Sequence, residues 1–140
     1  MPWRNTSESP SVLRFYLPIA PPANNAYTNV RGRGRIKSTR YQTWLKDADA
    51  HYMLQHLGGS RIMITVPYVC RMSFSDKLAG DLDGRAKLIL DWMVSRSLTP
   101  DDRHCWGLFL DKNADVPSKT VLIEVEPYVG SRMPSRARAA

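Results

Sequence analysis

The sequence is poor in the residues that build disulfides and metal sites, with 2 cysteines and 3 histidines among 140 residues. Cys70 and Cys105 each lie in an apolar, strand-like run with no second cysteine at ligand spacing, so we expect two reduced, mostly buried thiols. His51 and His56 stand five residues apart, which misses the spacing of four that places two imidazoles over one metal on a helix. A chain of this length buries about two thirds of its unfolded surface, so neither a disulfide nor a structural metal is needed for stability.

Long apolar runs and acidic residues are also scarce. No stretch approaches the roughly 18 consecutive apolar residues of a membrane span, and the polar N-terminus lacks the apolar core of a signal peptide, so we expect a cytoplasmic protein. Asp and Glu number 13 against 20 Lys and Arg, which gives a net charge of +7. Such a surplus of basic side chains favours polyanionic partners, either nucleic acid or an anionic membrane surface.

Length and apolar patterning predict a single α+β domain, in which a small mixed or antiparallel sheet is flanked by two main helices. We place this domain at residues 12–127, between a flexible polar lead at residues 1–11 and a basic, disordered tail at residues 128–140. β-Branched and aromatic residues predict four strands, the last two forming a hairpin, at residues 12–19, 61–72, 105–110 and 119–126.

Alternation along the last of these strands predicts one buried and one wet face, with Leu122, Glu124 and Glu126 on the wet face. In the strand at residues 61–72, Pro67 indicates a bulge or an edge position, because proline cannot donate to the hydrogen-bond ladder.

Two helices are predicted from apolar residues that recur at helical spacing. The first begins at Thr39, where Thr39 and Gln42 fit a capping box, and ends at Gly58-Gly59. The second buries an apolar stripe that runs from Leu82 to Val94. On another face of the second helix, charged residues recur every four positions, so that neighbours lie ~6 Å apart along the axis: Asp83, Lys87 and Asp91.

The segment between the first strand and the first helix joins a rigid turn to a basic loop. Pro21 and Pro22 fix an extended backbone, and Asn24 and Asn25 favour a turn, so residues 20–27 hold a defined shape and are most simply a rigid connector. Residues 28–40 carry five positive charges and no negative one: Arg31, Arg33, Arg35, Lys37 and Arg40. This loop either grips nucleic-acid phosphates or is a solvated hairpin tip, and both interpretations stay open.

Acidic residues gather where the basic surplus would not predict them. Nearly half of the 13 acids fall within residues 76–102: Asp76, Asp81, Asp83, Asp91, Asp101 and Asp102. Proteins hold Mg²⁺ with one or two carboxylates together with waters and substrate phosphate, so this cluster suggests phosphate chemistry. Helix capping competes with this interpretation, because Asp is favoured at helix starts, Asp83 and Lys87 suit a stabilising pair, and Thr99-Pro100-Asp101-Asp102 is typical of a helix N-terminus.

Three motifs follow one another along the chain: Pro-Pro-x-Asn-Asn-x-Tyr at residues 21–27, Asp-x-Asp-x-x-x-Lys-x-x-x-Asp at residues 81–91, and the pair Asp101-Asp102. In this order and spacing they resemble the RusA family of Holliday junction resolvases, and the resemblance covers about residues 13–127. It implies a small homodimeric endonuclease, often carried by phages and prophages, that uses Mg²⁺ or Mn²⁺ to nick four-way DNA junctions symmetrically during recombination and repair. Such an enzyme works in the cytoplasm of a bacterial or phage-infected cell and does not bind a membrane.

The resemblance also implies roles for single residues. Asp81, Asp83 and Asp102 correspond to metal-binding carboxylates, Asp101 to a neighbouring acid and Lys87 to the catalytic lysine. An ammonium group beside the metal stabilises charge that develops on the phosphate, and it is no metal ligand while it is charged. Asp91 lies two turns beyond Asp83 and is expected to support Lys87. Further supporting residues are Asn24, Asn25 and Tyr27.

Three positions depart from the family pattern: Gly84 stands where Asn is usual, Gly80 where a basic residue often precedes the first Asp, and Ala23 where Ser is usual. No proposed ligand is missing, but the DNA contact expected at Gly80 must come from Lys77, Arg85 or elsewhere. Two rival functions stay open. One is a nucleic-acid-binding protein without catalysis, in which the acids are caps; the other is a nuclease of similar chemistry that acts on forks, flaps or RNA.

Overall fold

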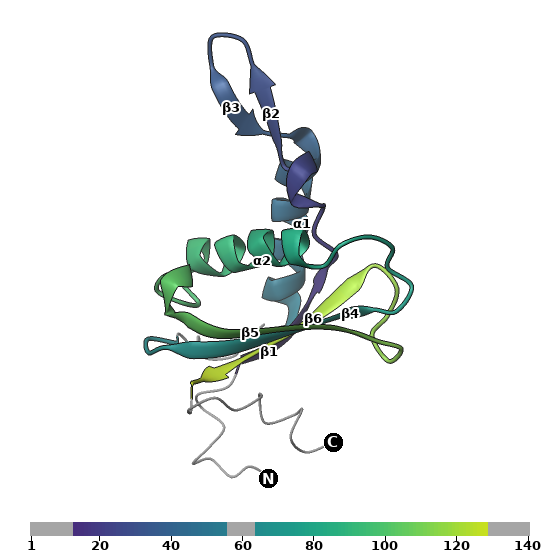
Figure 1. Cartoon of the computed structure of the whole chain (residues 1–140), viewed down its shortest axis with the longest axis vertical. Helices are drawn as coiled ribbons and strands as arrows, with labels where there is room; N and C mark the ends of the chain where they lie inside the picture. Colours follow the sequence, from purple (N-terminus) through teal and green to yellow (C-terminus); the bar gives the residue numbers. More distant parts are fainter. Residues whose placement is uncertain (1–12, 56–63, 129–140) are drawn as a thin grey trace.

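The structure, a computed structural model, describes residues 13–55 and 64–128, without the side chains of Val30 and Asp102. It is an α+β fold with a four-stranded mixed sheet and a separate two-stranded hairpin. The helices α1 (Thr39–Gln55) and α2 (Asp83–Ser95) pack against the larger sheet, and the hairpin of β2 (Tyr27–Val30) and β3 (Gly34–Lys37) stands away from this body (Figure 1). The predicted fold class, with its two main helices, is confirmed.

The larger sheet has the strand order β1 (Leu13–Pro18), β6 (Thr120–Pro127), β4 (Tyr68–Ser75), β5 (Cys105–Asn113). β1 and β4 both pair antiparallel with β6, whereas β5 pairs parallel with β4. A parallel neighbour requires a crossover connection, which α2 provides between β4 and β5. The predicted hairpin of the last two strands is therefore wrong, because β4 lies between them.

The boundaries of β4 also differ from the prediction of a strand at residues 61–72. The strand begins after Pro67, which has no N–H for the ladder, and the Pro67 carbonyl accepts a hydrogen bond from the backbone N–H of Tyr128 (2.9 Å). Residues 61–63 lie outside the described residues. At its other end β4 continues to Ser75, beyond the predicted end at residue 72.

Helix α1 begins at Thr39 as predicted, but its cap is different. The Oγ of Ser38 accepts a hydrogen bond from the N–H of Tyr41 (3.1 Å), and Nε2 of Gln42 donates to the carbonyl of Lys37 (2.9 Å). Ser38 rather than Thr39 therefore satisfies the first turn, because its side chain lies three residues before the N–H that it accepts, as a capping residue requires. The predicted end at Gly58-Gly59 lies outside the described residues.

Three aromatic rings join both helices to the sheet. Phe15 of β1, Tyr52 of α1 and Trp92 of α2 have ring centroids 5.2 to 5.8 Å apart. The indole N–H of Trp92 donates to Asp49 of α1 (2.9 Å), which satisfies its only donor. This packing fixes α2 over the sheet and therefore fixes where its acidic first turn lies.

The face of β6 that was expected to be wet is buried at Leu122 and Glu124, which are 2% and 8% exposed. The expectation fails because β6 is a central strand with neighbours on both sides. In the register Glu124 lies opposite Arg14 of β1 and Arg71 of β4; Arg14 pairs with Glu124 (3.5 Å) and Arg71 pairs with Asp111 of β5. These residues, Arg14, Glu124, Arg71 and Asp111, form the charge ladder of this sheet.

Both cysteines are free thiols, as predicted. Cys70 is fully buried in β4, and burial raises the pKa of its thiol well above the ordinary value, so the group stays neutral and unreactive. Cys105 is half-buried at the start of β5. Within the described part of the chain, neither helix combines the length and the apolar character that crossing a membrane requires.

Candidate active site

A pocket of ≈ 460 Å³ forms where the turn after β1 meets the start of α2. We call it the acidic pocket; its lining comes from Pro22, Ala23, Asn24, Asn25, Gly80, Asp81, Asp83, Gly84 and Arg85. The turn contains a short 3₁₀-helix, η2 (Ala23–Asn25), that follows the extended Pro22. The structure thus brings two of the three sequence motifs to one place.

Close packing between the two segments sets one wall of the acidic pocket. A Cβ at Gly84 would lie 3.3 Å from the backbone nitrogen of Ala23 and 3.4 Å from its Cβ. Glycine at position 84 therefore lets the helix start approach the turn this closely. Gly80 has a φ of 98°, a left-handed conformation that favours glycine in the loop leading to Asp81.

Asp81 and Asp83 are exposed carboxylates beside this pocket. The residue before α2, Leu82, makes no side-chain capping bond, and Oδ1 of Asp83 accepts from the N–H of Gly84 (2.9 Å). Asp83 therefore interacts with its own first turn, where the helix dipole favours a negative charge. The second carboxylate oxygen of Asp83 takes no part in this bond. Asp81 does not cap the helix, because the residue directly before it is Leu82.

Lys87 lies one turn beyond Asp83, but its ion pair is with Asp91, at 2.9 Å between Nζ and Oδ1. The contact agrees with the supporting role expected for Asp91, and it replaces the stabilising pair of Asp83 with Lys87 that capping would predict. Tyr41 of α1 lies near both side chains: burial and Tyr27 raise the pKa of Tyr41 to about 12, Asp91 also contributes to the rise, and Lys87 opposes the shift. Tyr41 therefore stays a neutral phenol beside the lysine.

Asp101 and Asp102 lie at a second short 3₁₀-helix, η3 (Asp102–His104), which contacts α2. Asp101 is half-buried and pairs with Arg103 (3.1 Å), and it also accepts a hydrogen bond from the backbone N–H of that residue (3.0 Å). The side chain of Asp102 lies outside the described residues. The expected capping role of Thr99 is wrong, because the residue is 1% exposed and its buried Oγ1 makes no hydrogen bond within the described part of the chain.

A cation in the acidic pocket would find two carboxylates among the described side chains. Among the described side chains, which do not include that of Asp102, no three from Asp, Glu, His or Cys lie close enough together to hold a metal. Two carboxylates nevertheless suit Mg²⁺, which commonly takes one or two from the protein and completes its shell with waters and substrate phosphate. The donor set of Asp81 and Asp83 fits that chemistry.

The supporting residues of the turn lie at the mouth of the acidic pocket and at the base of the hairpin. Asn24 and Asn25 are exposed, and the carbonyl of Asn25 accepts from Oγ of the capping Ser38 (2.7 Å). Tyr27 begins β2 and packs against Tyr41 with ring centroids 5.6 Å apart. The turn, the hairpin and α1 are therefore linked through backbone and ring contacts.

The basic loop is a β-hairpin, which we call the arm (residues 27–37). Its cations are exposed, with Arg31 and Arg33 at the tip and Arg35 and Lys37 along β3, and Arg40 follows at the start of α1. Arg35 stacks over Tyr27 at 4.4 Å from the ring centroid. The strands were missed because they are four residues each; the turn signal was visible in Gly32 and Gly34, which both have positive φ.

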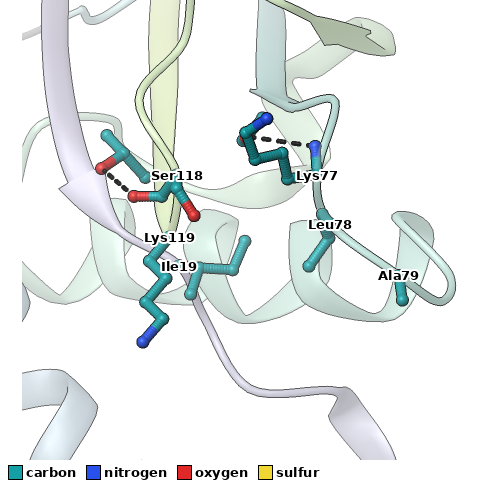
Figure 2. Close-up of a pocket in the computed structure, with 8 residues that line it drawn as sticks. Ile19, Lys77, Leu78, Ala79, Ser118 and Lys119 are labelled. Carbon is teal, nitrogen blue, oxygen red and sulfur yellow. Dashed lines mark hydrogen bonds between the residues drawn. The ribbon is translucent and has the colours of Figure 1, made fainter.

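Two residues expected to contact DNA beside Gly80 lie in different surroundings. Lys77 is exposed and lines a second pocket of ≈ 170 Å³ with Ile19, Ser118 and Lys119 (Figure 2). Arg85 is buried where it lines the acidic pocket, so a contact with DNA would be made inside the pocket and not on the open surface. Its folded-back side chain has no sequence signal, since arginine is usually exposed.

Comparison of the chain with protein-family models and with curated proteins finds no match. The interpretation of the site therefore rests on the residues and their arrangement.

Proposed function

We propose that this protein is a metal-dependent endonuclease that cuts branched DNA, four-way junctions above all. One observation carries the proposal: the acidic pocket combines Asn24 and Asn25 with Asp81 and Asp83, the central residues of two motifs that resemble the RusA resolvases. Motifs that are far apart in the sequence but share a pocket are more specific than either motif alone.

Asp81 and Asp83 would hold Mg²⁺ or Mn²⁺, with Asp102 and its neighbour Asp101 as the further acids that the resemblance implies. When bound, the ion supplies an acidified water and neutralises charge on the phosphate. Lys87 complements it: its ammonium group, oriented by Asp91 at 2.9 Å, donates hydrogen bonds to phosphate oxygens as negative charge develops there.

The arm supplies affinity for the backbone of the nucleic acid in this proposal. Its exposed cations stand away from the body of the protein, so they can contact phosphates at a distance from the acidic pocket. A two-stranded ribbon is narrow enough to enter a DNA groove. Branched DNA offers more such contact than a single duplex, because several DNA helices meet at the branch point.

A second candidate is a nucleic-acid-binding protein without catalysis. It is favoured by the arm, whose exposed cations can contact phosphates without any metal. In that case the arm is the functional element and the acidic pocket is a by-product of a helix start.

Cleavage of synthetic DNA by the purified full chain separates these candidates. We expect symmetric nicks in a four-way junction with Mg²⁺ and none with EDTA, and slower cleavage of forks, flaps, duplex and single strands at the same salt concentration. The salt must be fixed because phosphate-driven binding depends steeply on it. Junction binding without cleavage in Mg²⁺ or Mn²⁺ would instead favour the second candidate, and faster cleavage of forks, flaps or RNA would reassign the substrate.

We also infer a homodimer, because two identical sites related by a two-fold axis suit a junction that is cut at two symmetric positions. The outer strand β5 exposes Trp106 (62%) and Leu108 (41%), an apolar surface available to a second copy. Light scattering is expected to give about twice the chain mass of 15.9 kDa. A monomer both alone and on junction DNA would contradict this part of the proposal.

A further inference from the structure

The acidic pocket contains a buried cation that metal binding does not explain. Arg85, the third residue of α2, is 9% exposed and lines the pocket beside Asp81 and Asp83. Its Nη1 donates to the carbonyl of Ala20 (2.6 Å), and its Nη2 lies 3.9 Å from the position of a Cβ on Gly80. The Nε atom is buried with no hydrogen-bond partner.

The charge of this guanidinium is not neutralised within the described residues. None of the ion pairs found there includes Arg85. Burial lowers the pKa of Arg85, and the positive charge of Arg40 lowers it further. A buried cation without a counter-ion is costly, and here a second cation adds to that cost.

An anionic ligand would neutralise the charge of Arg85 and accept hydrogen bonds from its unused N–H donors. A guanidinium offers five N–H donors in a planar fork that matches two oxygens of one phosphate group. Of the polar atoms around Arg85, only the Ala20 carbonyl accepts a bond from it among the described residues. Donors therefore remain for a ligand that enters the acidic pocket.

We propose that Arg85 is the residue that binds the substrate phosphate inside the acidic pocket, beside the cation held by Asp81 and Asp83. This inference rests on the proposed nuclease function and assigns its phosphate subsite to a buried arginine rather than to the arm. The two carboxylates repel an anion, so phosphate is expected to bind more tightly when a divalent cation is also present.

Thermal unfolding of the full chain in inorganic phosphate tests the assignment, with chloride at the same ionic strength as reference, both with and without Mg²⁺. We expect phosphate to raise Tm of the parental protein, because a ligand that binds only the folded state stabilises it. Arg85→Met should lose this shift, with phosphate affinity lower by about 10- to 100-fold. In chloride its Tm should equal or exceed the parental value, because the unpaired charge is gone.

Arg96→Met is the matched control, since Arg96 follows the same helix but pairs with Asp49 away from the acidic pocket. It should keep the phosphate shift. Arg85→Lys keeps the charge without the fork and should bind phosphate more weakly than the parent. Equal shifts in the parent and Arg85→Met, no shift in the parent, or an unfolded Arg85→Met protein would each overturn the assignment, the last because it would give Arg85 a structural role.

Junction DNA distinguishes this inference from the function on which it rests. A phosphate shift that requires Arg85 in a protein that cuts no DNA would leave the anion site standing and end the nuclease proposal. Cleavage of the junction by Arg85→Met at the parental rate would leave the nuclease proposal standing and end this one. Binding of junction DNA in EDTA tests whether Arg85 also contacts a phosphodiester. We expect Arg85→Met to bind the junction more weakly than the parental protein.

Discussion

Asp83→Asn should reduce the rate of four-way junction cleavage in Mg²⁺ by about 10²–10³-fold or more. The amide keeps the size of the side chain and the oxygen that accepts from the Gly84 N–H, so the start of α2 should be unchanged. What the substitution removes is the negative charge that holds a cation. Single-turnover cleavage with saturating protein measures the reduction, and junction binding in EDTA should be retained.

Asp115→Asn is the matched control, because Asp115 is an exposed aspartate in the loop between β5 and β6, away from the acidic pocket. It should cut at the parental rate. Parental cleavage by Asp83→Asn would show that the acidic pocket is not the active site.

Lys87→Ala tests the group proposed to stabilise charge on the phosphate, as Asp83→Asn tests the group proposed to hold the metal. It should reduce the cleavage rate while leaving Mg²⁺ binding in place, because an ammonium group that donates to the transition state is not a metal ligand. Lys46→Ala, an exposed lysine of α1, provides the control. An equal fall in cleavage by both lysine variants would indicate a general effect of charge rather than a role in the reaction.

The arm should dominate the salt dependence of DNA binding. Replacing Arg31, Arg33 and Lys37 by Ala should lower the slope of log K against log salt by about 0.9 for each phosphate that is no longer neutralised, or roughly 2–3 in total. Arg35 is left in place because its stacking on Tyr27 helps to hold β3. Fluorescence anisotropy of a labelled junction at several salt concentrations measures the slope.

A charge-conserving variant controls for the shape of the arm. With Arg31→Lys, Arg33→Lys and Lys37→Arg, the slope should stay at the parental value, because each phosphate is still neutralised. An unchanged slope in the alanine variant would make the arm a solvated hairpin. An equally reduced slope in both variants would mean that the arm recognises something other than phosphate charge.

Local features of the fold could be predicted from the sequence. Three of them depend on residues close together in the chain: the start of α1 at Thr39, the strand near Leu13, and α2 with its charged residues Asp83, Lys87 and Asp91. The same holds for the motifs themselves, which are short patterns. The resemblance implied supporting roles for Asn24 and Asn25, but neither it nor periodicity predicted that two of the motifs would line one pocket.

Features that depend on distant neighbours were not predictable. The burial of Glu124 depends on Arg14 and Arg71, which lie in other strands. The burial of Arg85 depends on the carbonyl of Ala20, 65 residues earlier in the chain. Hydropathy classifies both residues as exposed, because it considers the side chain and not the partner that the fold supplies.

Ala23 and Gly84 both depart from the pattern of the family that the sequence resembles, and they lie close together, because a Cβ at Gly84 would come within 3.3 Å of the Ala23 backbone nitrogen. A larger side chain at position 84 would therefore crowd Ala23 unless the turn shifted by a few tenths of an ångström. The smaller pair is therefore best understood as one change in the wall of the acidic pocket rather than as two independent ones.

The charge ladder has a consequence for how the strands choose their neighbours. Along the order β1, β6, β4, β5 its residues alternate in sign, as Arg14, Glu124, Arg71 and Asp111. The hairpin of β5 with β6 that the sequence suggests would remove β4 from between these strands, so Asp111 would lose its ion pair with Arg71 and Glu124 would keep only Arg14 beside it. The ladder therefore favours the observed order, in which β4 lies between β5 and β6.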